Sequence, residues 1–106
     1  MLVKIKENAL KNNIPIIQDE ALAFIIDKIK INNIKTILEI GTAVGYSAIS
    51  FAVNDILIDT IERENDLYEK AIDNIAIMNL EDKINIIYAD ALKYETDKKY
   101  DLIFID

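Results

Sequence analysis

The chain has 106 residues, with 12 Lys and Arg against 19 Asp and Glu, and its net charge is −7. Its length predicts a single domain, and an apolar share of 52% predicts a folded chain rather than a disordered one. The sequence contains no His and no Cys. Ser-His-Asp and Cys-His catalysis, thiol redox chemistry and zinc sites built on imidazole or thiolate are therefore excluded.

The charge pattern and the amino-terminal residues predict a soluble, cytoplasmic protein. Lys4, Lys6 and Glu7 interrupt the first apolar residues, so no signal-peptide core is present. No apolar run approaches the roughly 20 residues that span a bilayer, so we expect no membrane partner. Arg63 is the only arginine, and an acidic chain of this kind is a poor stand-alone binder of nucleic acid but suits a cationic small ligand.

Two helices are predicted before the first strand. The stretch VKIKENALKNN predicts a short polar helix that ends at Asn12 and Asn13, because Pro15 disfavours helical geometry at the residue before it. Asp19 is the expected N-cap of a second helix, EALAFIIDKIKI. Its apolar residues recur at helical spacing: Leu22, Ile25, Ile26 and Ile29.

Beyond residue 33 the pattern changes to short β-branched runs separated by helical stretches. The predicted strands are Thr36–Ile40, Ile56–Ile61, Ile84–Ala89 and Asp101–Ile105, and the predicted helices between them are Ser47–Val53 and Asp66–Met78. The strands are almost continuously apolar, which predicts burial on both faces. Strands that alternate with helices indicate parallel βαβ units, and hence an open, Rossmann-like α/β sheet.

Both glycines of the chain, Gly41 and Gly45, follow the first predicted strand. An average chain of this size carries roughly seven glycines, so their concentration in one turn is unusual. In an open parallel sheet, ligands bind beyond the carboxyl ends of the strands, and glycine lets the backbone approach them closely. The helix that follows would offer free N–H groups to an anion. The alternative is a tight turn with no ligand.

Acidic side chains follow the other strands. Glu62 stands about 20 residues beyond the glycine turn, where an acidic residue accepts the hydroxyl protons of a ribose in dinucleotide sites. Asp90 is suited to accept a hydrogen bond from an adenine amine, and Asp106 ends the fourth strand. The alternatives are that Glu62 opens a solvated charged turn and that Asp90 caps a short helix.

These residues favour an adenosyl ligand that carries no phosphate. Ala43 occupies the place of the middle glycine of G-x-G-x-x-G, so a pyrophosphate would be hindered, and no P-loop is present. S-adenosylmethionine fits better, because its sulfonium and amine suit an acidic pocket. Two alternatives are an NAD-binding oxidoreductase fragment that uses Glu62, and a non-catalytic module whose apolar fourth strand joins a partner chain.

The segments ILEIGTAVGYSAI, DTIEREN, IYADAL and YDLIFID resemble the class I S-adenosylmethionine-dependent O-methyltransferases. More narrowly, they are similar to the metal-dependent branch that includes the catechol and caffeoyl-coenzyme A enzymes. With Pro15-Ile16-Ile17, they resemble most the bacterial tRNA 5-hydroxyuridine methyltransferases. The resemblance implies a helical segment over the cofactor (residues 1–33) and the first four strands of an S-adenosylmethionine-binding half-domain (residues 34–106).

The resemblance also implies roles for single residues. Ile17 would pack over the cofactor, and Glu39 and Gly41 would line its methionine part. Thr42 and Tyr46 belong to the same binding turn, and the Ser47 hydroxyl would bind the methionine carboxylate.

The remaining implied roles fall on acidic strand ends and their neighbours. Glu62 would hold the ribose, and Asp90 with the Ala91 backbone would bind adenine. Asp106 would be the catalytic residue, ligating Mg²⁺ near the methionine amine, where the metal would lower the pKa of a bound hydroxyl.

The resemblance implies that the acceptor is a hydroxyl of tRNA 5-hydroxyuridine, and a small phenolic or catechol-like acceptor remains the alternative. It also implies a homodimer. Family members are much longer, and the other metal ligands and the acceptor pocket would lie in their second half. We therefore expect a fragment that lacks turnover alone, with an open edge at its last strand.

Overall fold

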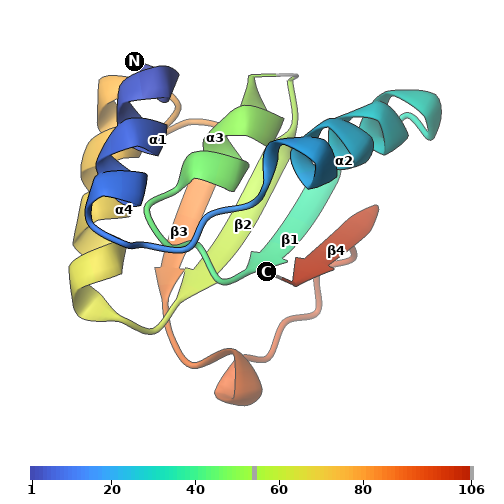
Figure 1. Ribbon diagram of the computed structural model, residues 1–106. Helices are drawn as coiled ribbons and strands as arrows, with labels where there is room; N and C mark the ends of the chain where they lie inside the picture. The colour runs from blue at the N-terminus through green and yellow to red at the C-terminus, as the bar shows by residue number, and fades with distance from the viewer. Residues whose placement is uncertain (54, 106) are drawn as a thin grey trace.

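The computed structural model describes residues 1–53 and 55–105. The helices are α1 (Leu2–Lys11), α2 (Asp19–Ile31), α3 (Tyr46–Ala52) and α4 (Asn65–Ile77), with a short 3₁₀ helix η1 (Ala91–Lys93). The strands are β1 (Thr36–Ile40), β2 (Leu57–Glu62), β3 (Ile84–Tyr88) and β4 (Leu102–Ile105). The strands form one parallel sheet in the order β3-β2-β1-β4 (Figure 1). The predicted Rossmann-like α/β fold is confirmed.

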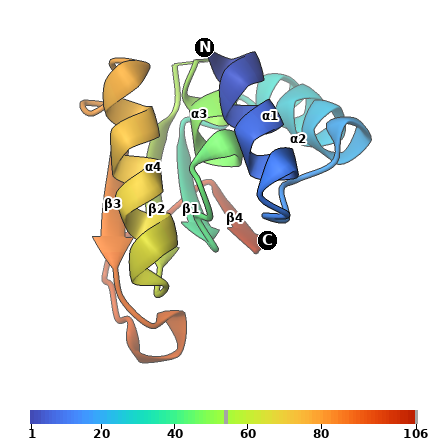
Figure 2. The same ribbon diagram turned by 60° about the vertical axis from the view of Figure 1, so that its left-hand side comes forward.

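The four helices lie on one face of the sheet (Figure 2). Buried apolar side chains of the helices and the strands form one core cluster. In the sheet, Ile37 of β1 pairs in register with Ile58 of β2, which pairs with Ile84 of β3, and all three side chains are buried. The Phe51 ring of α3 is also buried and meets the Phe104 ring of β4 edge to face, with centroids 5.7 Å apart. Apolar burial on this face is therefore continuous from β3 to β4.

The opposite face of the sheet, the open face, has no described helix over it. Leu38 of β1 and Ile61 of β2 are nevertheless buried there, so the prediction of burial on both faces is confirmed for the middle of the sheet and wrong for β4. Ile103 and Ile105 of β4 are 57% and 71% exposed, and Leu57 of β2 is 53% exposed. The reason lies in the connection between β3 and β4. Apart from the short η1, this connection has no regular secondary structure. Within the described residues, no α-helix is therefore available to cover this face.

Most predicted element ends are within one residue of the observed ones, but the predicted cap of α2 is wrong. Asp19 is the first helical residue, and Gln18 is the N-cap. The Asp19 carboxylate accepts a hydrogen bond from Lys6 Nζ at 2.6 Å, so it joins α2 to α1 instead of capping its own helix. Over the described residues, every helix is too short or too polar to span a membrane.

Candidate ligand-binding site

Two adjoining pockets lie at the carboxyl ends of the strands. One, of about 340 Å³, is formed by the residues that end or follow β1, β2 and β3, including Gly41, Glu62 and Asp90. The other, of about 240 Å³, lies between the α1–α2 connection and the glycine turn. Gly41 and Glu62 line both pockets. This edge of the sheet is where ligands of open α/β folds bind.

The glycine turn contains three residues with left-handed backbone geometry: Gly41 (φ +98°), Ala43 (φ +50°) and Gly45 (φ +88°). Elsewhere in the described chain, positive φ occurs only at Asn and Asp, the residue types that tolerate it best after glycine. These residues are Asn13, Asn33, Asp55 and Asn79. Both glycines are therefore reserved for this turn. Ala43 is the only described residue with positive φ that is not Gly, Asn or Asp, and such strain is concentrated at functional sites.

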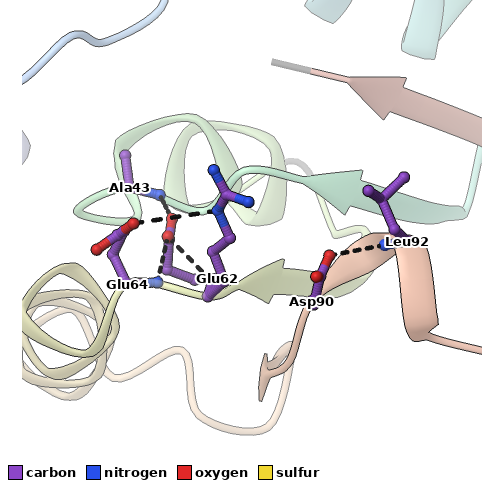
Figure 3. A network of polar contacts seen from close by, with 6 residues as sticks. Ala43, Glu62, Glu64, Asp90 and Leu92 are labelled. Atoms are coloured by element: carbon purple, nitrogen blue, oxygen red, sulfur yellow. Dashed lines mark hydrogen bonds and ion pairs between the residues drawn. The ribbon is translucent and has the colours of Figure 1, made fainter.

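Glu62 holds the glycine turn through backbone N–H groups. Its Oε1 accepts from the Ala43 N–H at 2.8 Å, and its Oε2 accepts from the Arg63 and Glu64 N–H groups at 3.1 and 2.9 Å (Figure 3). The side chain is only 6% exposed, so the alternative of a solvated turn is wrong for Glu62. A carboxylate offers about four acceptor positions. The described residues use three of them, and the fourth is on Oε1, beside the pocket.

Helix α4 and strand β2 fix the turn from two further sides. Asn74 of α4 donates its Nδ2–H to the Val44 carbonyl oxygen at 2.9 Å. The Gly41 and Thr42 N–H groups both donate to the Ile61 carbonyl oxygen, at 2.9 and 3.3 Å. The turn is therefore shaped before any ligand arrives, which lowers the entropic cost of binding.

Asp90 caps the short helix η1, which is one of the two roles predicted for it. Its Oδ1 accepts from the Leu92 N–H at 3.0 Å at the start of η1 (Figure 3). Its other carboxylate oxygen has no partner among the described residues, and both Asp90 and Ala91 line the larger pocket. Leu92 lies beside them and is 93% exposed. Capping and contact with a ligand are therefore compatible at Asp90.

A buried polar cluster joins the glycine turn to β1 and α3. It consists of Glu39, Thr42 and Ser47, and none of them lines either pocket. The Ser47 hydroxyl donates to Glu39 Oε2, and the Thr60 hydroxyl donates to Glu39 Oε1 at 2.7 Å. A hydroxyl has one proton to donate. Ser47 would have to release Glu39 before it could donate to a ligand carboxylate, so its direct role stays a prediction, as does that of Glu39.

The other predicted residues within the described chain lie in the core and not in the two pockets. Tyr46 and Ile17 are buried in the core, whereas Ile14 and Pro15, just before Ile17, line the smaller pocket. The α1–α2 connection therefore lies against the glycine turn, through residues to which the sequence gave no site role. That this segment covers a cofactor stays a prediction.

Asp106, the predicted catalytic and metal-ligating residue, lies outside the described residues. Across residues 1–53 and 55–105, no three acidic side chains come together as a metal site. Mg²⁺ therefore stays a prediction that depends on Asp106.

Comparison with known proteins identifies the family. The family model for O-methyltransferases matches residues 1–106, and the chain belongs to the O-methyltransferase family. A Staphylococcus aureus protein, assigned as a caffeoyl-CoA O-methyltransferase, is 39% identical with a TM-score of 0.91, over 96% of this chain and 51% of its own. An O-methyltransferase from Bacillus cereus, solved in complex with S-adenosylhomocysteine (SAH), is 28% identical with a TM-score of 0.84, over 99% and 53%. The chain spans about half the length of these relatives.

Proposed function

We propose that this chain is the S-adenosylmethionine-binding part of an O-methyltransferase. The observation that carries the proposal is the pocket at the carboxyl ends of the strands, where Gly41, Glu62 and Asp90 meet. Family membership supports it, and so does the relative from Bacillus cereus, whose structure holds SAH.

The polar groups of the pocket match an adenosyl ligand. The unused acceptor position on Glu62 Oε1 suits one ribose hydroxyl. A second ribose hydroxyl could bind Oε2 only by displacing one of its two backbone donors. The longer of these two hydrogen bonds, from the Arg63 N–H, is 3.1 Å. The unpartnered oxygen of Asp90 suits the adenine amine. Ala91 is the first residue of η1, so its N–H has no acceptor within the helix and suits a ring nitrogen.

In the proposed reaction, the oxygen of an acceptor hydroxyl attacks the methyl carbon of the sulfonium. The S–CH₃ bond breaks, its electron pair returns to sulfur, and the acceptor proton leaves. The described residues bind and orient the methyl donor, which lowers the entropic part of the barrier. The family resemblance implies that Mg²⁺ at Asp106 would lower the pKa of the hydroxyl. The described residues do not themselves form a metal site, and their part in the reaction is to hold the methyl donor.

For the acceptor, we propose the hydroxyl of 5-hydroxyuridine in tRNA. The support is the resemblance of Pro15-Ile16-Ile17, TIEREN and YDLIFID to the bacterial enzymes of that kind. The net charge of −7 favours the second candidate, a small phenolic or catechol-like acceptor. The test uses a longer protein in which this chain is joined to a second half like that of its relatives, because the chain alone is expected to lack turnover. Transfer of a labelled methyl group to tRNA that contains 5-hydroxyuridine, and not to catechol, would support the first candidate and contradict the second.

Calorimetric titration of the chain with SAH and with NAD tests the cofactor proposal. We expect SAH to bind and NAD to give no heat, because the left-handed Ala43 places a Cβ at the pocket wall where a pyrophosphate would approach. Binding of NAD in preference to SAH would contradict the proposal. Self-association without any heat from SAH would favour a non-catalytic interaction module.

A further inference from the structure

Thr60 is a fully buried polar residue in the middle of β2, and no role was predicted for it. Its side chain is 0% exposed and lies on the helix-covered face, where its backbone register neighbours are Glu39 of β1 and Ile86 of β3. A buried hydroxyl destabilises a fold unless it is hydrogen-bonded. Both hydrogen bonds of Thr60 run toward the glycine turn, which makes it a candidate for shaping the site.

The direction of these hydrogen bonds can be deduced from the number of protons. Thr60 donates its single hydroxyl proton to Glu39 Oε1 at 2.7 Å. Its Oγ1 lies 2.6 Å from Thr42 Oγ1, and because the Thr60 proton is already used, Thr42 must be the donor there. The order is therefore Thr42 to Thr60 to Glu39, and Ser47 donates to Glu39 from the other side.

This chain of donors ties both ends of the glycine turn to one carboxylate. Thr42 directly follows Gly41, which lines both pockets, and Ser47 lies in the first turn of α3. Glu39 accepts directly from Ser47 and is linked to Thr42 through Thr60. All four side chains are buried, so water is not available to replace a missing partner.

We propose that Thr60 is a positioning residue for the cofactor site, which fixes the glycine turn through Thr42 and Glu39 without touching the ligand. The inference rests on the proposed function in one respect: the measurement of SAH binding assumes that this site binds the cofactor. Valine in place of Thr60 would keep the shape of the side chain. It would also remove the Thr60 donor from Glu39 Oε1 and the acceptor of the Thr42 hydroxyl.

The test compares Thr60→Val and Thr60→Ser with a control, Thr36→Val, in calorimetric titrations with SAH. Thr36 lies at the opposite end of the sheet, where its hydroxyl accepts from the Asp101 N–H at 3.0 Å. We expect Thr60→Val to weaken SAH binding about tenfold or more, and Thr60→Ser, which keeps the hydroxyl, to stay within about threefold of the wild type. Thr36→Val should lower the melting temperature but keep the wild-type affinity.

Amide hydrogen exchange of residues 41–45 in the same variants, without ligand, tests the positioning claim separately. Exchange of these amides should rise in Thr60→Val and not in Thr36→Val. If the wild type fails to bind SAH, the proposed function fails, and the exchange result still decides the role of Thr60. If Thr60→Val does not fold, Thr42→Val replaces it, because that variant keeps the Thr60–Glu39 bond.

Wild-type affinity together with wild-type exchange in Thr60→Val, or in Thr42→Val if that variant is used, would overturn the inference. An equal loss of affinity in Thr60→Val and Thr36→Val would also overturn it, because the effect would then follow general stability and not the position of the turn.

Discussion

At the scale of single residues, left-handed backbone geometry separates the site from the rest of the chain. Asn and Asp supply this geometry after the helices, and Gly41, Ala43 and Gly45 supply it in the glycine turn. At Gly45, an added Cβ would meet its nearest atom, Ala71 Cβ, at 3.6 Å, which is ordinary contact. Gly45 is therefore required by its φ of +88° and not by a lack of space.

We expect Gly45→Ala to lower the free energy of unfolding by about 1–2 kcal/mol, which is the cost of a left-handed alanine. Ala43→Gly in the same turn should stay within about 0.5 kcal/mol of the wild type, because relief of strain and added entropy of the unfolded chain oppose each other. Urea unfolding measures both. If Gly45→Ala is as stable as the wild type, strain does not limit this turn.

The sequence predicted that Gly41, Glu62 and Asp90 would lie together, but not how the glycine turn is held. Gly41, Glu62 and Asp90 could be placed together because the carboxyl ends of parallel strands meet at one edge. The three N–H groups on Glu62 could not be predicted, because they depend on the path of the folded turn. Thr60 gave no signal, since threonine is an ordinary residue in strands.

At the scale of elements, the connection from β3 to β4 is attached to the open face through Asp59 of β2. Asp59 Oδ2 accepts from the Tyr100 hydroxyl at 2.6 Å and from Lys98 Nζ at 3.1 Å, and Asp59 Oδ1 accepts from Asn85 Nδ2 at 3.2 Å. Burial alone would raise the pKa of Asp59, but these hydrogen bonds outweigh it and hold the pKa below 3.8. Burial and the bond to Asp59 together raise the pKa of Tyr100 from 10.0 to about 12.

The raised pKa of Tyr100 predicts a loss of stability in alkali. The folded state keeps the Tyr100 proton up to a pH of about 12, whereas the unfolded chain releases it near 10.0. The stabilisation is therefore complete below pH 10.0 and is lost as the pH rises toward 12. Tyr100→Phe should cost about 1 kcal/mol at neutral pH, because Asp59 loses a donor. Its difference from the wild type should shrink across that alkaline range.

Urea unfolding at pH values below and above 10.0 measures this effect. Tyr88→Phe is the control, because Tyr88 is 55% exposed and its hydroxyl has no hydrogen bond within the described part of the chain. A constant difference between the wild type and Tyr100→Phe at every pH would show that the Tyr100 proton is not coupled to folding.

Element type and order were predictable, because short runs of β-branched residues alternate with stretches of helical periodicity. Asp19 shows why element ends were less certain. Asp is a common N-cap, but the sequence does not reveal that Lys6 of α1 lies close enough to bind this carboxylate.

At the scale of the whole molecule, the sheet has one covered and one open face. The continuous apolar pattern of the strands predicted two covered faces, and the described chain provides helices for only one of them. Exposed Ile103 and Ile105 therefore lie on the open face at the free edge of β4, and exposed Leu57 lies on the same face in β2. An exposed apolar strand at a sheet edge favours association.

We expect the chain to self-associate through this face as its concentration rises, and we expect Ile103→Lys to shift it toward the monomer in analytical ultracentrifugation. Leu10→Lys on α1 is the matched control, because Leu10 and Ile103 are both 57% exposed. A wild type that stays monomeric, or an equal shift in Leu10→Lys, would contradict this account of the open face.

In the proposed site, Glu62 both shapes the glycine turn and receives the ribose of an adenosyl ligand. Calorimetric titration of SAH into Glu62→Gln tests it most directly, because the amide has a single acceptor oxygen and cannot satisfy the N–H groups of Ala43, Arg63 and Glu64. Glu64→Gln is the control, since it makes the same change of charge on an exposed side chain whose ion pair with Arg63 is 4.0 Å long. We predict at least about a tenfold loss of SAH affinity in Glu62→Gln and none in Glu64→Gln. Wild-type affinity in Glu62→Gln would contradict the claim.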